Sequence, residues 1–284
     1  MKSFIYWIKA SRPQTLIASL APIIPTSMLC LKLDNFKIEI FIITLLTALL
    51  IQIMTNFIND LYDYKKGTDR SDRIGPKRMM QQGKITEQKM MKGIIFIFSI
   101  ALALGFYLVN IGGIPILVIG ISSFLFAYLY TATKIAIAYN GLGELFVFLY
   151  FGVIASLGTY YLQTSYISKE SVLIGIISGA LNVTLLIINN IRDFREDLSS
   201  NKNTLVVIFG VLFGKIELLL MVILAYSSLY YFLNLIGLGH TLFLYIPIFS
   251  IVIVLIYRIF TDENFIIKAF PFVSLHILSF IILL

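Results

Sequence analysis

The sequence predicts an all-α integral membrane protein, a bundle of nine transmembrane helices around a central cavity that opens to the cytoplasm. Hydrophobic residues make up 59% of its 284 residues, above the share of about one half that is typical of soluble domains. Charged residues make up only 13% and fall between apolar runs of about 18 to 22 residues, the length that a helix needs to cross a bilayer. The short alternating segments of a membrane β-barrel are missing. Two acidic clusters stand at the ends of two apolar runs, and they indicate where the function lies.

The apolar runs predict a single transmembrane domain over residues 1–284. Asn110-Ile-Gly-Gly predicts a tight turn between the third and fourth spans. Gly210 and Gly214 interrupt the apolar stretch 204–213, which places the start of the seventh span near residue 216. The nine predicted spans cover residues 15–32, 38–60, 90–109, 113–131, 143–162, 172–191, 216–234, 241–260 and 265–284.

The basic residues predict the orientation. With a cytoplasmic N-terminus and an external C-terminus, the inner segments hold 19 of the 22 Lys and Arg residues, and the outer loops hold only Lys32, Lys37 and Lys169. The positive-inside rule therefore favours this topology in the plasma membrane of a bacterium. It also accounts for the net charge of +7 without nucleic acid as a partner.

Seven of the 15 acidic residues lie in the first acidic cluster, residues 56–73, and the second acidic cluster, residues 189–204. Both follow a span that ends on the predicted cytoplasmic side. Helical spacing places the members of each cluster on one stripe, because residues three, four and seven apart share a helix face. The first stripe is Asn56, Asp60 and Asp63, and the second is Asn189 or Asn190, Asp193 and Asp197.

Two facing stripes of carboxylate and amide oxygens favour a divalent cation, and Mg²⁺ usually takes one or two carboxylates with water and substrate phosphates as its other ligands. Such a site suits a diphosphate bridged by Mg²⁺, with nearby bases supplying counter-charge. The basic candidates are Arg70, Arg73, Lys77, Arg78, Lys134, Arg192, Arg195 and Lys202.

Two other interpretations compete with this one. Charges at span ends can be solvated caps, but acidic residues at membrane depth are costly and usually functional. A cation-coupled transporter would also carry intramembrane carboxylates, although these lie near the bilayer centre in such proteins. Here the carboxylates lie at span ends among bases, which favours an interfacial site for an anionic, metal-bound head group whose lipidic tail lies among the helices.

At these residues the sequence resembles the UbiA superfamily of intramembrane prenyltransferases, over nearly the whole chain. Within it, the chain is most similar to the branch that prenylates 1,4-dihydroxy-2-naphthoate in menaquinone biosynthesis. Four segments carry the resemblance: Lys9–Thr15, Asn56–Asp69 with Gly75–Arg78, Ala138–Phe148 with Phe151-Gly152, and Asn189–Asp193 through Lys202–Val207.

The resemblance implies an Mg²⁺-dependent enzyme that transfers a polyprenyl group from an allylic polyprenyl diphosphate to the naphthoate, with decarboxylation. It implies Asp60, Asp63, Asp193 and Asp197 as the catalytic and metal-binding residues, assisted by Asn56 and Asn190. It implies Arg73, Lys134 and Lys202 as contacts of the diphosphate. Arg12, Tyr139 and Glu144 are candidates for the aromatic acceptor. Another acceptor, such as 4-hydroxybenzoate, a haem or a glycerol phosphate, is the nearest alternative, and the sequence identifies no protein partner.

Overall fold

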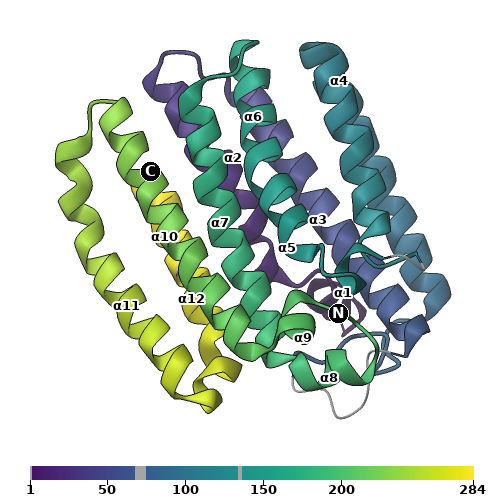
Figure 1. Cartoon of the computed structure of the whole chain (residues 1–284). Coiled ribbons are helices and arrows are strands. Elements are labelled where there is room, and N and C mark those ends of the chain that lie inside the picture. The colour runs from purple at the N-terminus through teal and green to yellow at the C-terminus, as the bar shows by residue number, and fades with distance from the viewer. Residues whose placement is uncertain (1, 68–74, 134–135) are drawn as a thin grey trace.

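The computed structural model describes residues 2–67, 75–133 and 136–284, and in these ranges the chain is helical with no strand (Figure 1). One isolated bridge pairs Asn140 with Asn203. The helices are α1 (Lys2–Ala10), η1 (Pro13–Thr15), α2 (Ile17–Lys32), α3 (Ile38–Lys66), α4 (Glu87–Leu129), η2 (Ile137–Tyr139), α5 (Gly143–Phe148), η3 (Leu149–Val153), α6 (Ile154–Thr164), α7 (Lys169–Arg192), α8 (Phe194–Ser199), α9 (Leu205–Phe209), α10 (Val211–Leu235), η4 (Gly239–Tyr245), α11 (Ile246–Thr261) and α12 (Glu263–Leu283).

Seven helices in the described ranges are long and apolar enough to cross a membrane. The count is eight if the segments Ser3–Thr15 and Ile17–Lys32, which meet at a bend of 57°, form one span. The chain is therefore an integral membrane protein, and the number nine stays a prediction. The predicted start of the seventh span near residue 216 is wrong. α10 begins at Val211, because Gly210 takes a φ of 91° that ends α9 and lets the next helix start at once.

The 43-residue helix α4 folds back on itself. Gly113 has a φ of 63° and a ψ of −148°, which interrupts the helix where the sequence predicts a turn. The rings of Phe98 and Phe124 lie 5.0 Å apart, although 26 positions of straight helix would separate them by about 39 Å. The two halves of α4 are therefore antiparallel neighbours, as predicted for the segments 90–109 and 113–131.

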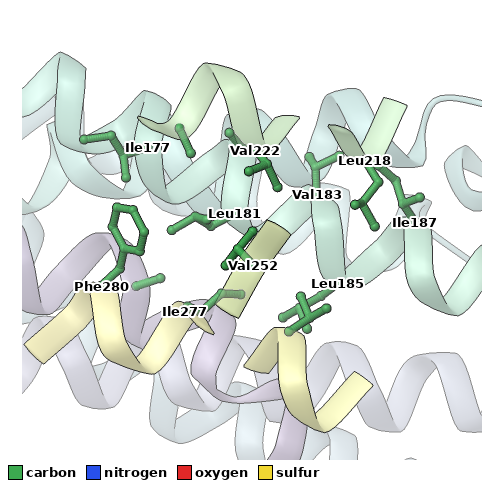
Figure 2. Packing of buried hydrophobic residues seen from close by; sticks show 14 of the residues in the cluster. Ile177, Leu181, Val183, Leu185, Ile187, Leu218, Val222, Val252, Ile277 and Phe280 are labelled. Carbon is green, nitrogen blue, oxygen red and sulfur yellow. The ribbon is translucent and has the colours of Figure 1, made fainter. Parts of the chain in front are cut away.

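Helix α7 lies at the centre of the bundle. In its most apolar stretch, 78% of the residues are buried inside the protein, against 44% or less in each of the other candidate spans among the described helices. Ile177, Leu181 and Ile187 pack against side chains of α10 and α12, as Figure 2 shows. The second acidic cluster therefore extends from the most enclosed helix of the described structure.

Two prolines inside α2 leave two of its carbonyl groups without the usual hydrogen-bond donor from the same helix. Side chains of α7 donate to these carbonyl groups instead. Pro22 and Pro25 have no N–H, so the carbonyls of Ala18 and Ala21 lose the usual bond from four residues later. Asn182 Nδ2 donates to Ala18 O at 2.9 Å, and Ser178 Oγ donates to Ala21 O at 2.9 Å. The same Asn182 amide donates to Phe151 O at 2.6 Å. One buried side chain thus joins α2, η3 and α7.

Replacing Asn182 with leucine is expected to lower the free energy of unfolding by about 1–2 kcal/mol, because two carbonyl groups would lose a donor away from water. The measurement is the thermal unfolding temperature of the purified protein in detergent. Ser250→Ala is the matched control, since the Ser250 hydroxyl bonds a carbonyl of its own helix at an exposed position. An Asn182→Leu variant that unfolds at the wild-type temperature would contradict this role.

Candidate active site

The described part of the first acidic cluster, residues 56–67, lies at the C-terminal end of α3, which ends where Gly67 adopts a φ of 71°. Asn56, Asp60 and Asp63 are all buried, with exposed fractions of 3%, 1% and 7%. Asn56 Nδ2 donates to Ser11 O at 2.8 Å and to Thr15 Oγ1 at 3.0 Å, which orients its amide. The stripe predicted from spacing is present.

Asp60 has an oxygen that is ready for a ligand. Its Oδ1 atom is buried and accepts no hydrogen bond from the part of the chain that the structure describes. The Arg12 charge is close enough to attract the carboxylate, and the Asp63 charge is close enough to repel it. A buried carboxylate oxygen without a donor is costly unless a cation or another donor satisfies it.

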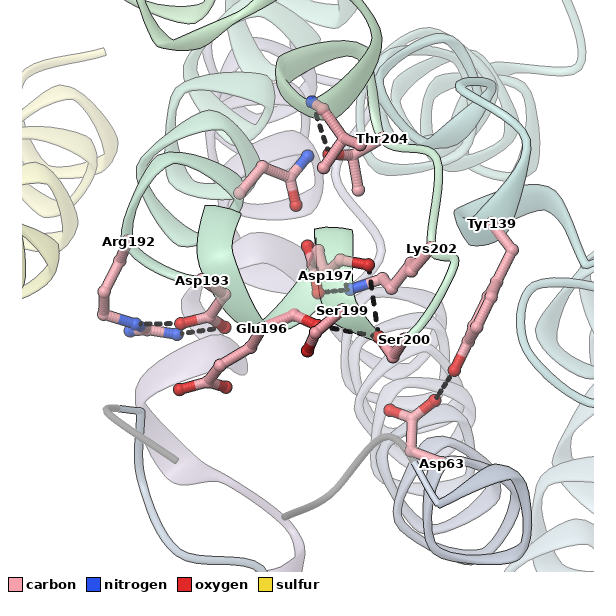
Figure 3. A network of polar contacts seen from close by, with 12 residues as sticks. Asp63, Tyr139, Arg192, Asp193, Glu196, Asp197, Ser199, Ser200, Lys202 and Thr204 are labelled. Atoms are coloured by element: carbon pink, nitrogen blue, oxygen red, sulfur yellow. Dashed lines mark hydrogen bonds and ion pairs between the residues drawn. The ribbon is translucent and has the colours of Figure 1, made fainter. Parts of the chain in front are cut away.

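The second acidic cluster differs from the predicted stripe, because α7 ends at Arg192. Asp193 takes φ −90° and ψ 9°, and Asp197 lies on the separate short helix α8. The Arg192 guanidinium donates to both oxygens of Asp193, at 2.6 and 2.8 Å, as Figure 3 shows. The two aspartates are buried on two elements instead of one helix face.

Lys202 is the basic partner of Asp197. Its Nζ lies 3.1 Å from Oδ1 and 3.3 Å from Oδ2 of Asp197 (Figure 3). Burial alone would lower the pKa of Lys202, but the negative charges of Asp197 and Asp63 outweigh that effect and raise it above the ordinary value. Lys202 therefore keeps its positive charge at neutral pH.

Tyr139 connects the two acidic clusters. Its hydroxyl donates to Asp63 Oδ1 at 2.9 Å (Figure 3), and its carbonyl accepts from the backbone N–H of Asn203, next to Lys202. Lys66 Nζ lies 4.2 Å from the centre of the Tyr139 ring. The segment around residue 139 thus holds the two clusters in a fixed relation.

A cavity of about 1360 Å³ joins these parts. Residues of both clusters line its polar part, among them Asp60, Asp63 and Asp193, and apolar side chains line the rest. Along α3 its lining reaches from Asp63 to Thr44, which is about 28 Å of helix and comparable to the thickness of the bilayer core. The cavity can hold a diphosphate at one end and a long apolar tail below it.

The structure brings most of the predicted site residues to this cavity. Those that line it are Arg12, Asn56, Asp60, Asp63, Glu144, Asn190, Asp193 and Lys202. Asp197 and Tyr139 are not among the lining residues. Asp197 contacts Lys202, and Tyr139 contacts Asp63. Arg73 and Lys134 lie outside the described residues. Asn190 donates from Nδ2 to Glu144 Oε1 at 2.8 Å, a contact that the sequence did not predict.

Two site residues were missed at the sequence level. Lys66 Nζ donates to Thr131 O at 2.6 Å and to Thr133 O at 2.9 Å, so it holds the loop after α4 against α3. Asn59 accepts a hydrogen bond from Thr131 Oγ1 at 2.6 Å and lines the cavity. The signal for Lys66 was its place three residues after Asp63 on the same helix.

Residues 19–273 match the UbiA prenyltransferase family. The chain belongs to this family. A 1,4-dihydroxy-2-naphthoate octaprenyltransferase of Haemophilus influenzae is 35% identical over 218 residues, which are 74% of this chain and 71% of that protein. The Escherichia coli protein of the same name is 35% identical over 210 residues, which are 72% of this chain and 68% of that protein. The Bacillus subtilis protein of the same name is 31% identical over 210 residues, which are 72% of this chain and 66% of that protein.

The UbiA fold extends over the whole chain. A UbiA homologue from Archaeoglobus fulgidus, solved with GPP and Mg²⁺, superposes with a TM-score of 0.70, with 98% of each chain covered and 17% sequence identity. A digeranylgeranylglyceryl phosphate synthase gives a TM-score of 0.60 at 19% identity, with 99% of this chain and 98% of that one covered. These likenesses show the UbiA fold.

The donor set of this UbiA chain fits Mg²⁺. All the candidate ligands are oxygen atoms, which hard divalent cations prefer. Within residues 2–67, 75–133 and 136–284, no group of three or more His, Cys, Asp or Glu side chains could hold an ion by itself. An ion here would complete its shell with water and substrate oxygens, as Mg²⁺ commonly does. The unbonded Oδ1 of Asp60 is a natural ligand for it.

Proposed function

We propose that this enzyme transfers a polyprenyl group from an allylic polyprenyl diphosphate to 1,4-dihydroxy-2-naphthoate, with loss of carbon dioxide, in menaquinone biosynthesis. The observation that carries the proposal is one cavity that combines two carboxylate clusters at its polar end with an apolar interior. The bacterial relatives named 1,4-dihydroxy-2-naphthoate octaprenyltransferase support the acceptor, and the archaeal homologue bound to GPP and Mg²⁺ supports the donor.

The chain's own residues can account for binding and ionisation of the donor. Asp60, Asp63, Asp193 and Asp197 would hold Mg²⁺, which supplies positive charge to the departing diphosphate. Lys202 would donate hydrogen bonds to the same diphosphate as negative charge develops on it. Arg73 and Lys134 are proposed to add positive charge there.

The transfer then proceeds by exchange of one bond for another. The allylic C–O bond breaks, and its electron pair leaves with the diphosphate. The electron-rich naphthoate ring forms a C–C bond to the allylic carbon, the carboxyl group leaves as carbon dioxide with loss of its proton, and the ring regains its aromaticity. The apolar walls exclude water, which would otherwise capture the allylic cation.

The topology belongs to the same proposal. The bent pair before residue 32 and the two antiparallel halves of α4 would raise the seven candidate spans to nine. The basic residues favour a cytoplasmic N-terminus and an external C-terminus. The polar end of the cavity would then open to the cytoplasm of a bacterium, where soluble substrates arrive.

The test is an incubation of membranes that contain the protein with labelled polyprenyl diphosphate, Mg²⁺ and the naphthoate. A prenylated naphthoquinone is the expected product. Prenylation of 4-hydroxybenzoate or another acceptor alone would replace the naphthoate assignment. Absence of any Mg²⁺-dependent prenylation would remove the enzyme assignment and favour the transporter.

Replacing Tyr139 with phenylalanine is expected to raise the Mg²⁺ concentration for half-maximal activity severalfold, because Asp63 would lose one oriented hydrogen bond. The ring and its contact with Lys66 would remain. The measurement is the Mg²⁺ dependence of the initial rate, with Tyr231→Phe as a control at a side chain that is 67% exposed. An unchanged Mg²⁺ dependence would remove the positioning role of Tyr139.

A further inference from the structure

Three aromatic rings meet at the wall of the cavity. Phe126 comes from α4, Phe146 from α5 and Tyr150 from η3, and all three line the cavity. The Phe126 ring centre lies 4.6 Å from that of Phe146 and 4.9 Å from that of Tyr150. The rings of Phe146 and Tyr150 are nearly parallel, at 9°. Each side chain is only half-buried, so part of its surface is left for a ligand.

A local irregularity of the helix places two of these rings. Residues Leu149–Val153 form a π-helical turn, and Phe151 departs from helical geometry with φ −96° and ψ 17°. Such a turn changes the direction of the side chains around it and is frequent at functional sites. Here Asn182 holds the Phe151 carbonyl, so the irregular turn is fixed by a second helix.

A buried carboxylate stands next to the rings. Glu144 precedes Phe146 by two residues, is 5% exposed, and lines the same cavity. Its Oε1 accepts from Asn190, which belongs to the second acidic cluster. A carboxylate oxygen can accept more than one hydrogen bond. The distance along the helix from Glu144 to Tyr150 is about 9 Å, comparable to the length of a two-ring aromatic molecule.

We propose that Phe126, Phe146 and Tyr150, here termed the aromatic seat, bind the planar aromatic acceptor, and that Glu144 accepts a hydrogen bond from one of its ring hydroxyls. This inference rests on the proposed function. Tyr130, whose N–H bonds the Phe126 carbonyl one turn earlier in the chain, is close enough to Asp63 and Asp197 to interact with their charges. The seat therefore lies about one helical turn from the carboxylate clusters, where the first carbons of a prenyl chain would follow a bound diphosphate. A flat acceptor stacked there faces the carbon that it must attack.

The experiment measures the two substrates separately, by equilibrium binding to the full-length protein in detergent. The acceptor probe is 1-hydroxy-2-naphthoate, followed by its own fluorescence. The donor probe is geranyl S-thiolodiphosphate with Mg²⁺, followed by calorimetry. The variants are Phe146→Leu, Tyr150→Leu, Tyr150→Phe and Glu144→Gln, with Phe243→Leu as a control at an exposed ring.

We expect each leucine variant to bind the naphthoate about three- to tenfold more weakly, since leucine keeps bulk but removes the stacking face. Glu144→Gln should also weaken naphthoate binding. Phe243→Leu should bind like the wild type, and Tyr150→Phe, which keeps the aromatic ring, should bind the naphthoate more tightly than Tyr150→Leu. Donor binding should not change in the variants of the three rings. A leucine variant that binds donor normally has kept its fold.

Three results would overturn the proposal that the aromatic seat binds the acceptor. Unchanged naphthoate binding in the leucine variants would show that the rings do not contact the acceptor. Loss of donor and acceptor binding together, at an unchanged unfolding temperature, would assign the rings to the prenyl chain instead. Failure of the wild-type protein both to bind 1-hydroxy-2-naphthoate and to prenylate 1,4-dihydroxy-2-naphthoate would overturn the proposed function with it, whereas the first two results would leave that function in place.

Discussion

Replacing Asp60 or Asp193 with alanine is expected to reduce the rate of prenyl transfer by about 10²- to 10³-fold, the order seen when one group that stabilises developing charge is removed. Each carboxylate is buried at the polar end of the cavity, and the clusters to which they belong lie on different helices. Loss of either should weaken the hold on Mg²⁺ and the diphosphate at the moment of bond cleavage. The measurement is the initial rate with labelled donor and the naphthoate at saturating Mg²⁺.

The amount of folded protein must be measured in the same membranes, by size-exclusion chromatography after extraction. Glu263→Ala is the matched control, because it removes an exposed carboxylate from the first turn of α12 and should leave the rate unchanged. A rate close to that of the wild type in either aspartate variant would show that the carboxylate does not take part in the reaction.

Replacing Gly152 with alanine is expected to destabilise the protein by about 1–3 kcal/mol or to prevent its accumulation, because the new methyl group has no space. A Cβ atom at this position would lie 2.5 Å from Gly179 N and 2.6 Å from Gly175 O, which are backbone atoms of α7. A backbone cannot move aside as a side chain can, so η3 and α7 would have to separate.

The unfolding temperature can be read through Cys30, the single cysteine of the sequence, whose buried thiol becomes reactive to a fluorogenic maleimide when the bundle opens. Gly120→Ala is the control, since a Cβ atom there would meet nothing within 4 Å. That variant should be unchanged or slightly more stable, because alanine favours helix over glycine. Equal unfolding temperatures for Gly152→Ala and the wild type would contradict the close approach.

The sequence predicted the features that depend on local pattern. Apolar length identified the chain as a bundle of membrane-spanning helices, Gly113 marked the turn inside α4, and Asn56, Asp60 and Asp63 lie on one helix as their spacing predicts. The orientation in the membrane stays a prediction. The roles of Arg73 and Lys134 also stay predictions, because these two residues lie outside the described ranges.

Several features that depend on contacts between distant segments were not predicted. The break after Arg192 moves Asp197 to its own helix, although the spacing alone fits a continuous one. The π-helical turn at Leu149–Val153 is held by Asn182, 31 positions from the carbonyl that it bonds. The link from Tyr139 to Asp63 also joins residues from separate elements. Periodicity within one segment carries no information about such partners.

The bond between Asn182 and the α2 carbonyl has an evolutionary consequence. Asn182 donates a hydrogen bond to the Ala18 carbonyl, because Pro22 has no N–H with which to do so. A homologous chain with an ordinary residue in place of that proline would regain the missing N–H and would need no amide from the neighbouring helix. We therefore expect the two positions, 160 residues apart, to change together among related proteins, and a chain that keeps the proline should keep a hydrogen-bond donor opposite it.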